Sequence, residues 1–568
     1  MLAFAPWVWL FAGASTAGLL KVRDGTSSGP IAVTKNGSYA GVYDGVYKQD
    51  YFLGVPYALP PTGERRFRIP QSLNTTWSGT KDAKSYSKEC VGYGSDQWPY
   101  EISEDCLYLN VIRPSGYENT KLPVALWIHG GGYTEGGGVD QRYNLSFIVQ
   151  NSVAIGKPII GVSINYRLSA WGFLYSREMQ GSGNTNVGLR DQRLALHYVQ
   201  ENIASFGGDP EKVTIFGESA GGSSVGFHLT AYNGRDDKLF RGAMMESGNP
   251  VAYGALKTSE WYQPLYDSIS VQAGCNNTLN SLECLRSVPY ETLNSIINGT
   301  TKASNGGTLT AFGPTVDGDF IARYTSLQMA DGSFVKVPII SGANSDEGSA
   351  FSPRGINTTT DFETSLLADV PPSLATQLLE AYPDDPSVNV IASLGDARPG
   401  PPYGAQFRRS ASYYGDAIFI ANRRLTCQTW AASGTPAYCY RFNAITSNVD
   451  PVIAVTHFQE VAFVFLDLLG IGYPPLNKNP FEGKGENTAR LARFMSSSWV
   501  GFVSDLDPNV WRAGAGWEGS EEVWPLYDLE SPMDYVFDAN VSSYAEMDTY
   551  REEGMRLIND NNFGVYGR

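Results

Sequence analysis

Apolar and polar positions along the first half of the chain alternate between two patterns, short unbroken apolar runs and runs with helical spacing. Unbroken runs of this length indicate buried strands, and spacing of three to four residues indicates helices. The predicted strands are Leu122–His129, Pro158–Asn165, Val213–Phe216 and Gly242–Glu246, and the predicted helices are Asp191–Phe206 and Ala220–Thr230. Strands and helices that alternate in this way predict a parallel sheet with right-handed crossover connections.

The second half of the chain continues the same pattern after an irregular middle section, from about Gly254 to Lys336. Further strands are predicted at Pro338–Ala343 and Ala437–Phe442, and further helices at Glu486–Asp505 and Tyr544–Asn559. No internal repeat, low-complexity linker or block of like charge divides the chain. We therefore expect one α/β domain with insertions, spanning residues 18–568.

Composition narrows the range of functions. The chain has 568 residues, 42% of them hydrophobic, and a formal net charge of −16. A chain of this composition can bury a large core, which excludes intrinsic disorder. The acidic balance argues against nucleic-acid binding, which needs a basic surface. With only four histidines in the chain, a His-rich metal site is disfavoured, and we expect neither a metal nor a cofactor.

The N-terminus and the cysteines point to export. Residues 1–17 form a short apolar run that ends in small residues, which is typical of a cleaved signal peptide. No Lys or Arg stands near Met1, and the alternative is an apolar first strand. No other segment is long and apolar enough to cross a membrane, so we expect no stable membrane insertion.

Six cysteines form three sequence-local pairs without C-x-x-C spacing, as expected for disulfides that close short loops in an exported protein. They are Cys90, Cys106, Cys275, Cys284, Cys427 and Cys439. Seven N-glycosylation sequons begin at Asn36, Asn74, Asn144, Asn276, Asn298, Asn357 and Asn540. Together with the leader, these features predict a secreted glycoprotein, either a monomer or a homodimer.

One motif carries clear chemistry. Within Val213–Gly222 (VTIFGESAGG), the residues around Ser219 fit the pattern G-x-S-x-G. A serine on a sharp turn between a strand and a helix needs small neighbours, because larger side chains would clash in the turn. An apolar strand precedes this motif and a helical pattern follows it. The alternative, a purely structural glycine turn, does not account for that context.

The partners of a nucleophilic serine follow from chain order. Three consecutive glycines in Trp127–Tyr133 (WIHGGGY) are expected to supply backbone N–H groups to an oxyanion hole. The order serine, acid, histidine restricts the general base to a histidine after Ser219. His228 lies in the helix that leaves the turn and cannot fold back, which leaves His457. The acid should follow the strand Pro338–Ala343, and elimination does not choose between Asp346 and Glu347.

Several blocks together resemble the cholinesterase and type-B carboxylesterase–lipase family. They are Ser103–Asn110 (SEDCLYLN), WIHGGGY, Asn165–Phe173 (NYRLSAWGF), Asn186–Arg193 (NVGLRDQR), Phe206–Pro210 (FGGDP), Val213–Gly222, Met245–Pro250 (MESGNP), Asp346–Gly348 (DEG) and His457. They extend from about residue 25 to the C-terminus. The resemblance implies an α/β-hydrolase fold, in which a mostly parallel mixed sheet is flanked by helices and carries helical insertions.

The resemblance also assigns roles to individual residues. It implies a catalytic triad of Ser219 as nucleophile, Glu347 as acid and His457 as general base. The oxyanion N–H groups are implied to belong to Gly131, Gly132 and Ala220. Cys90–Cys106 and Cys275–Cys284 match the two usual disulfides of the family, whereas Cys427–Cys439 lies outside that pattern and is expected to be bonded as well.

The loop between the first two cysteines bears on the substrate. In the lipases of this family it is a long amphipathic lid, but here only fifteen residues (VGYGSDQWPYEISED) separate Cys90 from Cys106, without an apolar helical stripe. We therefore expect a carboxylesterase that hydrolyses soluble, small-molecule esters. The alternatives are a lipase or sterol esterase that acts on long-chain lipid esters, and a non-catalytic adhesion relative.

Two aromatic residues are candidates for the substrate pocket. Trp98 lies near the position of the cation-binding tryptophan of cholinesterases, but packing at the rim of the pocket is the alternative. Phe312 precedes Gly313 and is a candidate for the acyl pocket, with core packing as the alternative.

Overall fold

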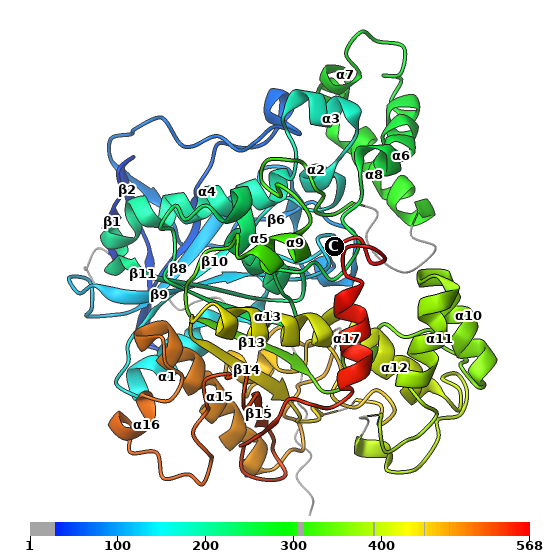
Figure 1. The fold of residues 1–568 in the computed structure, drawn as a ribbon. Helices are drawn as coiled ribbons and strands as arrows, with labels where there is room; N and C mark the ends of the chain where they lie inside the picture. Colours follow the sequence, from blue (N-terminus) through cyan, green and yellow to red (C-terminus); the bar gives the residue numbers. More distant parts are fainter. Residues whose placement is uncertain (1–28, 305–311, 390–391, 448, 476) are drawn as a thin grey trace, which may run out of the picture.

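A mixed sheet of eleven strands crosses the centre of the part of the molecule that the structure describes (Figure 1). The structure is a computed structural model that describes residues 29–304, 312–389, 392–447, 449–475 and 477–568. The predicted leader, residues 1–17, lies outside these ranges. The strands, in their order across the sheet, are β16 (Tyr544–Met547), β15 (Met533–Phe537), β14 (Ala437–Phe442), β13 (Ile339–Asn344), β12 (Gly242–Glu246), β11 (Gly208–Glu218), β9 (Leu122–Ile128), β10 (Ile160–Ile164), β8 (Tyr108–Pro114), β4 (Gln49–Pro56) and β3 (Val42–Asp44).

The central part of the sheet is parallel and its edges are antiparallel. Neighbouring strands from β15 to β10 pair in parallel. Strand β16 at one edge, and β8, β4 and β3 at the other, pair antiparallel. Smaller strands pair outside this sheet: β1 (Ile31–Val33), β2 (Ser38–Ala40), β5 (Thr80–Asp82), β6 (Glu89–Cys90) and β7 (Ile102–Ser103). The predicted α/β-hydrolase architecture is therefore present.

Both faces of the sheet are buried, which explains why its strands appear in the sequence as unbroken apolar runs. In β9, Val124, Leu126 and Ile128 belong to the hydrophobic cluster on one face, whereas Ala125 and Trp127 belong to the cluster on the other. All five side chains are fully buried. A strand whose side chains pack on both faces cannot show the alternation of apolar and polar residues that marks an exposed sheet.

Helices cover the two faces (Figure 1). One layer contains α4 (Val187–Asn202), α5 (Ala220–Gly234) and α13 (Ala421–Ala432), and the other contains α1 (Leu145–Ala154) and α15 (Glu486–Asp505). The shorter helices are α2 (Ser169–Phe173), α3 (Arg177–Ser182), α9 (Thr325–Asp331), α14 (Val461–Val464) and α16 (Trp511–Gly514). None of the helices in the described ranges combines the length and the apolar character that a membrane span requires.

Two helical insertions and a C-terminal helix extend from the sheet on the same side of the molecule (Figure 1). The first insertion contains α6 (Ser259–Gln272), α7 (Ser281–Ser287) and α8 (Tyr290–Ser304). The second contains α10 (Thr359–Asp369), α11 (Pro372–Ala381) and α12 (Phe407–Gly415), and α17 (Glu552–Asp560) packs against α11. The irregular section expected after Gly254 thus contains the first of these insertions.

Two predicted helices differ from the observed ones. The helix predicted at Asp191–Phe206 begins earlier, at Val187, and its last residues, Ile203–Phe206, form a 3₁₀ turn. The helix predicted at Tyr544–Asn559 is wrong in its first part, because Tyr544–Met547 forms β16 and pairs antiparallel with β15. Pairing with the edge of the sheet decides the structure there, and helix begins only at Glu552.

All six cysteines are bonded in the expected pairs, Cys90–Cys106, Cys275–Cys284 and Cys427–Cys439. The third pair joins α13 to β14.

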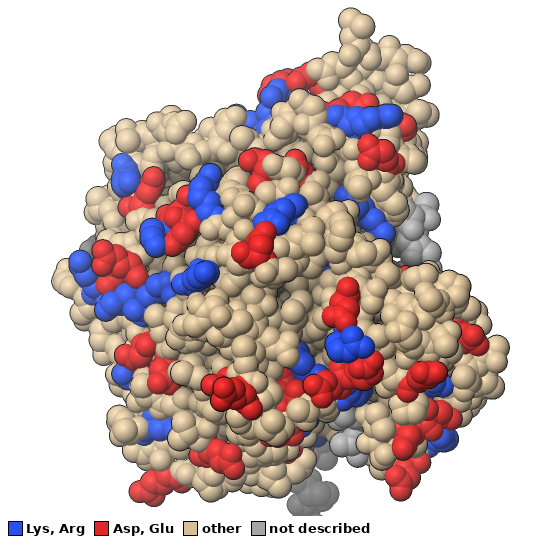
Figure 2. Space-filling model, viewed as in Figure 1, with Lys and Arg blue, Asp and Glu red and all other residues tan. Residues whose placement is uncertain are grey.

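On the face drawn in Figure 2, basic side chains are interspersed with acidic ones, and the whole chain carries a formal net charge of −16.

Candidate active site

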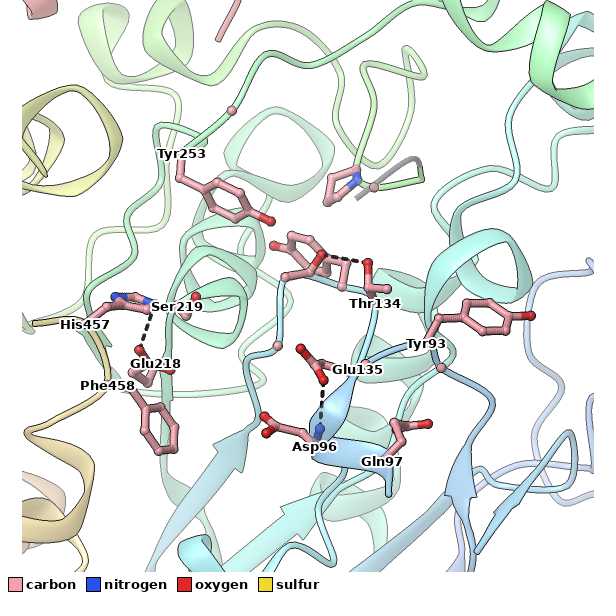
Figure 3. Close-up of a pocket in the computed structure, with 18 of the residues that line it drawn as sticks. Tyr93, Asp96, Gln97, Thr134, Glu135, Glu218, Ser219, Tyr253, His457 and Phe458 are labelled. Atoms are coloured by element: carbon pink, nitrogen blue, oxygen red, sulfur yellow. Dashed lines mark hydrogen bonds and ion pairs between the residues drawn. The ribbon is translucent and has the colours of Figure 1, made fainter. Parts of the chain in front are cut away.

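Ser219 occupies a strained turn between β11 and α5. Its backbone angles are φ 57° and ψ −122°, a conformation that residues other than glycine rarely adopt. The neighbouring glycines make this turn possible, because a Cβ atom on Gly221 would lie 2.0 Å from the carbonyl oxygen of Ile128, and one on Gly217 would lie 2.5 Å from it. The predicted requirement for small residues is met, and the Ser219 side chain faces a cavity (Figure 3).

The three glycines that follow β9 lie directly against this turn. A Cβ atom on Gly130 would come within 3.1 Å of the Ser219 Cβ. Gly131 and Gly132 adopt φ values of 87° and 60°. Within the described chain, neither of them donates its N–H to a protein acceptor. Ala220 is the first residue of α5, where an N–H group has no partner inside the helix. Three backbone donors beside Ser219 are thus available to a ligand.

His457 and Glu347 meet at the carboxyl end of the sheet. His457 Nδ1 lies 2.7 Å from Glu347 Oε2, and the other carboxylate oxygen of Glu347 accepts a hydrogen bond of 2.7 Å from the backbone N–H of Asn344. The Asp346 carboxylate instead accepts from the backbone N–H of Val455. Glu347, not Asp346, contacts the histidine, which is the choice that elimination alone left open.

The second imidazole nitrogen of His457 lies beside Glu218 and Ser219. Its Nε2 is 3.1 Å from Glu218 Oε1, and Ser219 Oγ makes no hydrogen bond to any residue that the structure describes. Catalytic hydrogen bonds are often long or misaligned in an unliganded enzyme. His457 and Ser219 nevertheless line the same cavity, next to each other (Figure 3).

Burial and the nearby carboxylates have opposite effects on the pKa of the His457 imidazole. Burial alone would lower the pKa of His457, but the nearby Glu218 and Glu347 carboxylates outweigh it and raise the pKa to about 9. Burial raises the pKa of Glu218 and the charge on His457 opposes that rise, so the two groups titrate as a pair. Phe419 stacks on the imidazole, with 4.7 Å between ring centroids, and fixes the plane of the ring.

Three further residues complete this polar cluster, and none of them was predicted from the sequence. Ser247 Oγ donates to Glu347 Oε1, and Asn344 Nδ2 donates to Glu460 Oε2. Burial raises the pKa of Glu460 to about 7. Glu460 and Glu218 are fully buried acids, and each is within three residues of a predicted site residue, a signal that could have drawn attention to them.

The cavity above Ser219 has a volume of about 1260 Å³. Its walls come from the loop between Cys90 and Cys106, the glycine loop, the start of the first helical insertion and the residues around His457 (Figure 3). Aromatic side chains contribute much of the lining: Tyr93, Trp98, Tyr100, Tyr133, Tyr143, Phe227, Tyr253, Trp261, Tyr262, Phe351, Phe419 and Phe458. A largely apolar cavity with a few convergent polar groups is typical of a small-molecule site.

The two predicted pocket residues have different outcomes. Trp98 lines the mouth of the cavity and is 76% exposed, so it lies on the rim. The prediction for Phe312 is wrong, because its side chain is fully buried outside the cavity wall and stacks on Tyr262, 6.0 Å between ring centroids. Its neighbours Gly313 and Pro314 line the cavity instead. The core-packing alternative applies to Phe312.

The three remaining histidines lie away from this chemistry. His228 is buried in α5, where its Nε2 lies 3.0 Å from Gln192 Oε1. His129 is buried beneath the glycine loop and stacks on Tyr166, and His197 is exposed on α4. These positions agree with the elimination that left His457.

The predicted glycosylation sites are not equally accessible. Asn74, Asn276, Asn357 and Asn540 are exposed, whereas Asn36, Asn144 and Asn298 are half-buried. The side-chain amide of Asn36 already donates to the carbonyl oxygens of Leu73 and Thr75. Asn298 lines the cavity. Glycosylation therefore stays a prediction that fits the four exposed sites best.

The fold and this constellation of side chains define a carboxylic ester hydrolase of the α/β-hydrolase fold. The chain belongs to the carboxylesterase family, whose sequence model matches residues 28–554. The substrate implied by the family is a small-molecule ester.

Known relatives include lipases and esterases. The chain is 34% identical to "Secreted lipase 1" of Botryotinia fuckeliana (strain B05.10) over 84% of this chain and 83% of that lipase. It is 33% identical to "Lipase 1" of Geotrichum candidum over 95% of this chain and 97% of that lipase. Among solved structures, Aspergillus niger EstA is similar with a TM-score of 0.80 and 28% identity, over 95% of this chain and 99% of EstA. A PNB esterase is similar with a TM-score of 0.74 and 26% identity, over 94% of this chain and all of that chain.

Proposed function

We propose that this chain is a secreted serine carboxylesterase that hydrolyses soluble, medium-sized esters through an acyl-enzyme. Ser219 is the nucleophile, His457 the general base and Glu347 the orienting acid. The observation that carries the proposal is the position of His457, whose Nδ1 is held 2.7 Å from Glu347 while its other edge faces the Ser219 turn. Secretion is supported by three disulfides and by relatives named as secreted lipases.

In the first half of the reaction, Ser219 Oγ attacks the ester carbonyl carbon and His457 Nε2 takes the hydroxyl proton. The carbonyl π electrons move to the oxygen, and the N–H groups of Gly131, Gly132 and Ala220 stabilise that negative charge. Collapse of the tetrahedral intermediate breaks the bond to the alcohol oxygen, which takes the proton back from His457. The alcohol leaves, and the acyl group stays on Ser219.

In the second half, water repeats the attack on the acyl-enzyme. His457 takes a proton from the water, whose oxygen bonds to the acyl carbon. The second tetrahedral intermediate then releases Ser219, which recovers its proton from His457, and the carboxylic acid leaves. Glu347 keeps the imidazole in the required tautomer and stabilises its cationic form in both halves. Removal of one oxyanion donor costs about 3 kcal/mol in the transition state.

The preference for soluble esters rests on the loop between Cys90 and Cys106. It contains a single 3₁₀ turn, Ser95–Gln97, and no α-helix. The loop is tied to the glycine-loop region, since Tyr93 N donates to Thr134 O at 2.8 Å and Asp96 N donates to Glu135 Oε2 at 2.8 Å. A short loop held at both ends by a disulfide is suited to form a fixed wall rather than a lid that opens at a lipid surface.

The main alternative is a lipase that acts on long-chain esters. It is favoured by the names of the relatives and by two exposed aromatic side chains at the cavity mouth, Trp98 at 76% and Trp261 at 47% exposure. An adhesion role without catalysis is disfavoured, because each member of the proposed triad is present: Ser219 and His457 line the cavity, and Glu347 is buried against His457.

Initial rates with p-nitrophenyl butyrate and p-nitrophenyl octanoate, measured below and above their solubility limits, separate these alternatives. The proposal predicts hyperbolic kinetics with no rise at the solubility limit, and lower kcat/KM for long acyl chains than for butyrate. A jump in rate at the limit, together with a preference for long chains, would establish the lipase alternative. No turnover of either substrate would refute ester hydrolysis by this site.

A further inference from the structure

One wall of the cavity is a short irregular segment, residues 252–256, that connects the end of β12 to the first helical insertion. All five of its residues line the cavity. Tyr253 points into the cavity (Figure 3) and lies between Tyr133 and Phe419, with ring centroids 6.1 Å and 6.2 Å away. Because neither a helix nor a strand fixes this backbone, the shape of the wall depends on contacts from elsewhere in the chain.

Those contacts come from the C-terminal segment, residues 562–568. Arg568 Nη1 donates to the carbonyl oxygens of Ala252 at 3.3 Å and Tyr253 at 3.2 Å. In the opposite direction, Leu256 N donates to Gly567 O at 2.8 Å. Across the described ranges of the chain, no other segment forms a hydrogen bond with the backbone of 252–256. The two segments are joined although more than 300 residues separate them (Figure 1).

Arg568 is itself firmly held. It is 2% exposed, and its Nε and backbone N–H both donate to Asn562, at 2.9 Å each. The Asn562 side chain donates to Asn422 in α13, and Ser326 Oγ in α9 donates to the Arg568 carbonyl oxygen. The guanidinium also lies over the ring of Tyr566, 4.6 Å from its centroid. The segment thus connects the cavity wall to α13 and α9.

The chemistry of this contact is unusual for a buried arginine. Buried charges are normally paired with an opposite charge, because removing an ion from water is costly. No Asp or Glu side chain in the described ranges forms an ion pair with Arg568, whose guanidinium binds carbonyl oxygens and an amide. Burial accordingly lowers the pKa of Arg568 to about 10. Burying an arginine without an acidic partner lowers the free energy of unfolding. Packing alone therefore does not explain why an arginine stands at this position.

We propose that Arg568 is a positioning residue that fixes the 252–256 wall and thereby sets how large an ester the cavity binds. Two charge-assisted bonds to consecutive carbonyl groups hold the backbone on either side of the Tyr253 side chain, and the Leu256–Gly567 bond holds the far end. The contact is made by residues beyond 28–554, the range that the family model matches. The proposal rests on the proposed esterase function.

The test compares R568A, R568K and the control R556A in the full chain, with any purification tag on the N-terminal side. Arg556 is an arginine of α17 that is about half exposed and pairs with Glu553 and Asp560. KM and kcat are measured with p-nitrophenyl acetate, butyrate and octanoate below their solubility limits. We expect R568A to raise KM for octanoate about tenfold, to change KM for acetate less than about twofold and to leave kcat within about threefold.

R568K should recover part of the octanoate KM, since an ammonium group can reach one of the two carbonyl groups, and R556A should behave as wild type. An equal change in KM for all three esters, or no change, would refute the proposal. If R568A does not fold, R568Q keeps an N–H donor near the position of Nε, which contacts Asn562, but is too short to reach Ala252 and Tyr253, and the same comparison applies.

Amide hydrogen exchange provides a readout that does not depend on activity. In R568A, peptides covering 252–257 should exchange faster than in wild type, whereas peptides from α5 should not change. Equal exchange at 252–257 in R568A and wild type would refute the proposal.

The proposed function has its own test: it fails if the wild type hydrolyses no ester and an organophosphate does not modify Ser219. If the wild type hydrolyses the esters and is labelled at Ser219, and R568A behaves like the wild type, only the role of Arg568 is refuted.

Discussion

The environment of His457 determines when the proposed base is available. The imidazole touches two carboxylates, Glu347 at 2.7 Å through Nδ1 and Glu218 at 3.1 Å through Nε2. Only Glu347 is placed to orient the ring for the proposed proton transfer from Ser219. Glu218 lies on the catalytic edge of the ring and stabilises the protonated form, which is inactive as a base.

This geometry predicts the direction of a shift in the pH profile. The proposed mechanism needs neutral His457, whose pKa is raised to about 9, so kcat/KM should rise with pH up to about that value. E218Q removes one carboxylate beside the imidazole and lowers its pKa, so the acidic limb of the kcat/KM profile should move to lower pH. E135Q is a suitable control, because Glu135 lines the same cavity away from His457. An acidic limb that stays in place or moves upward in E218Q would contradict this account of the imidazole.

Some residues of the site could be predicted from the sequence and others could not. The Ser219 turn has a local pattern, since the glycines and the flanking elements are neighbours in the chain. His457 followed from the small number of histidines, and the choice of Glu347 needed a family resemblance, because Asp346 stands next to it. Ser247 and Asn344 join the cluster only through folding, so no local pattern reveals them, and for Glu460 the one signal in the sequence was that it lies three residues after His457. Phe312 could not be assigned, because sequence does not tell a cavity wall from the layer behind it.

At the scale of secondary-structure elements, the glycine loop after β9 shows how backbone conformation supports the proposed chemistry. Gly131 has a φ of 87°, and a Cβ atom there would lie 2.2 Å from the carbonyl oxygen of Glu135. An alanine at this position must therefore displace the loop that carries two of the proposed oxyanion donors.

G131A should accordingly lower kcat about 10²- to 10³-fold, the usual cost of losing an oxyanion donor. G116A is the matched control: Gly116 has a φ of 90°, but a Cβ atom there meets nothing within 4 Å. Both substitutions place an alanine at a positive φ, so each variant is expected to be less stable than wild type by a similar amount. Steady-state kinetics of the two folded variants check the prediction, and a kcat for G131A as high as that of G116A would argue against the oxyanion assignment.

The position of a strand in the sheet also explains whether the sequence could predict it. The central strands were predictable because each is buried on both faces and is therefore unbroken in its apolar character. Tyr544–Met547 was misassigned because an edge strand with half-buried side chains has no such run, and only its pairing with β15 makes it a strand.

At the scale of the whole molecule, buried ion pairs attach the C-terminal part of the chain to the helical layers. Asp548 follows β16 and accepts hydrogen bonds from Arg423 and Arg424 of α13 and from Tyr527. Although burial opposes ionisation, the two guanidinium groups hold the pKa of Asp548 well below its usual range. The C-terminal segment that carries Arg568 thus starts from a fixed position.

D548A should lower the free energy of unfolding by about 3–5 kcal/mol, because it leaves the buried guanidinium of Arg424 without its carboxylate and that of Arg423 with Asp534 alone. E553A, which removes an exposed partner of Arg556, should leave the free energy of unfolding nearly unchanged. Since the pKa of Asp548 is depressed in the folded state, its stabilising contribution is present above the unfolded value near pH 4 and is lost as the pH falls below it. Urea unfolding of both variants and wild type between pH 3 and pH 7 tests this, and equal stabilities of D548A and E553A would contradict it.

The central claim is that Ser219 is the nucleophile of an ester hydrolase, and covalent labelling tests it most directly. Wild type and S219A are treated with the organophosphate diethyl p-nitrophenyl phosphate, digested and mapped by mass spectrometry, with p-nitrophenyl butyrate turnover measured in parallel. The account predicts one diethylphosphoryl group on Ser219, loss of activity in proportion to labelling, and a kcat for S219A reduced by about 10⁵-fold or more. Labelling at another residue, or full activity in S219A, would contradict it.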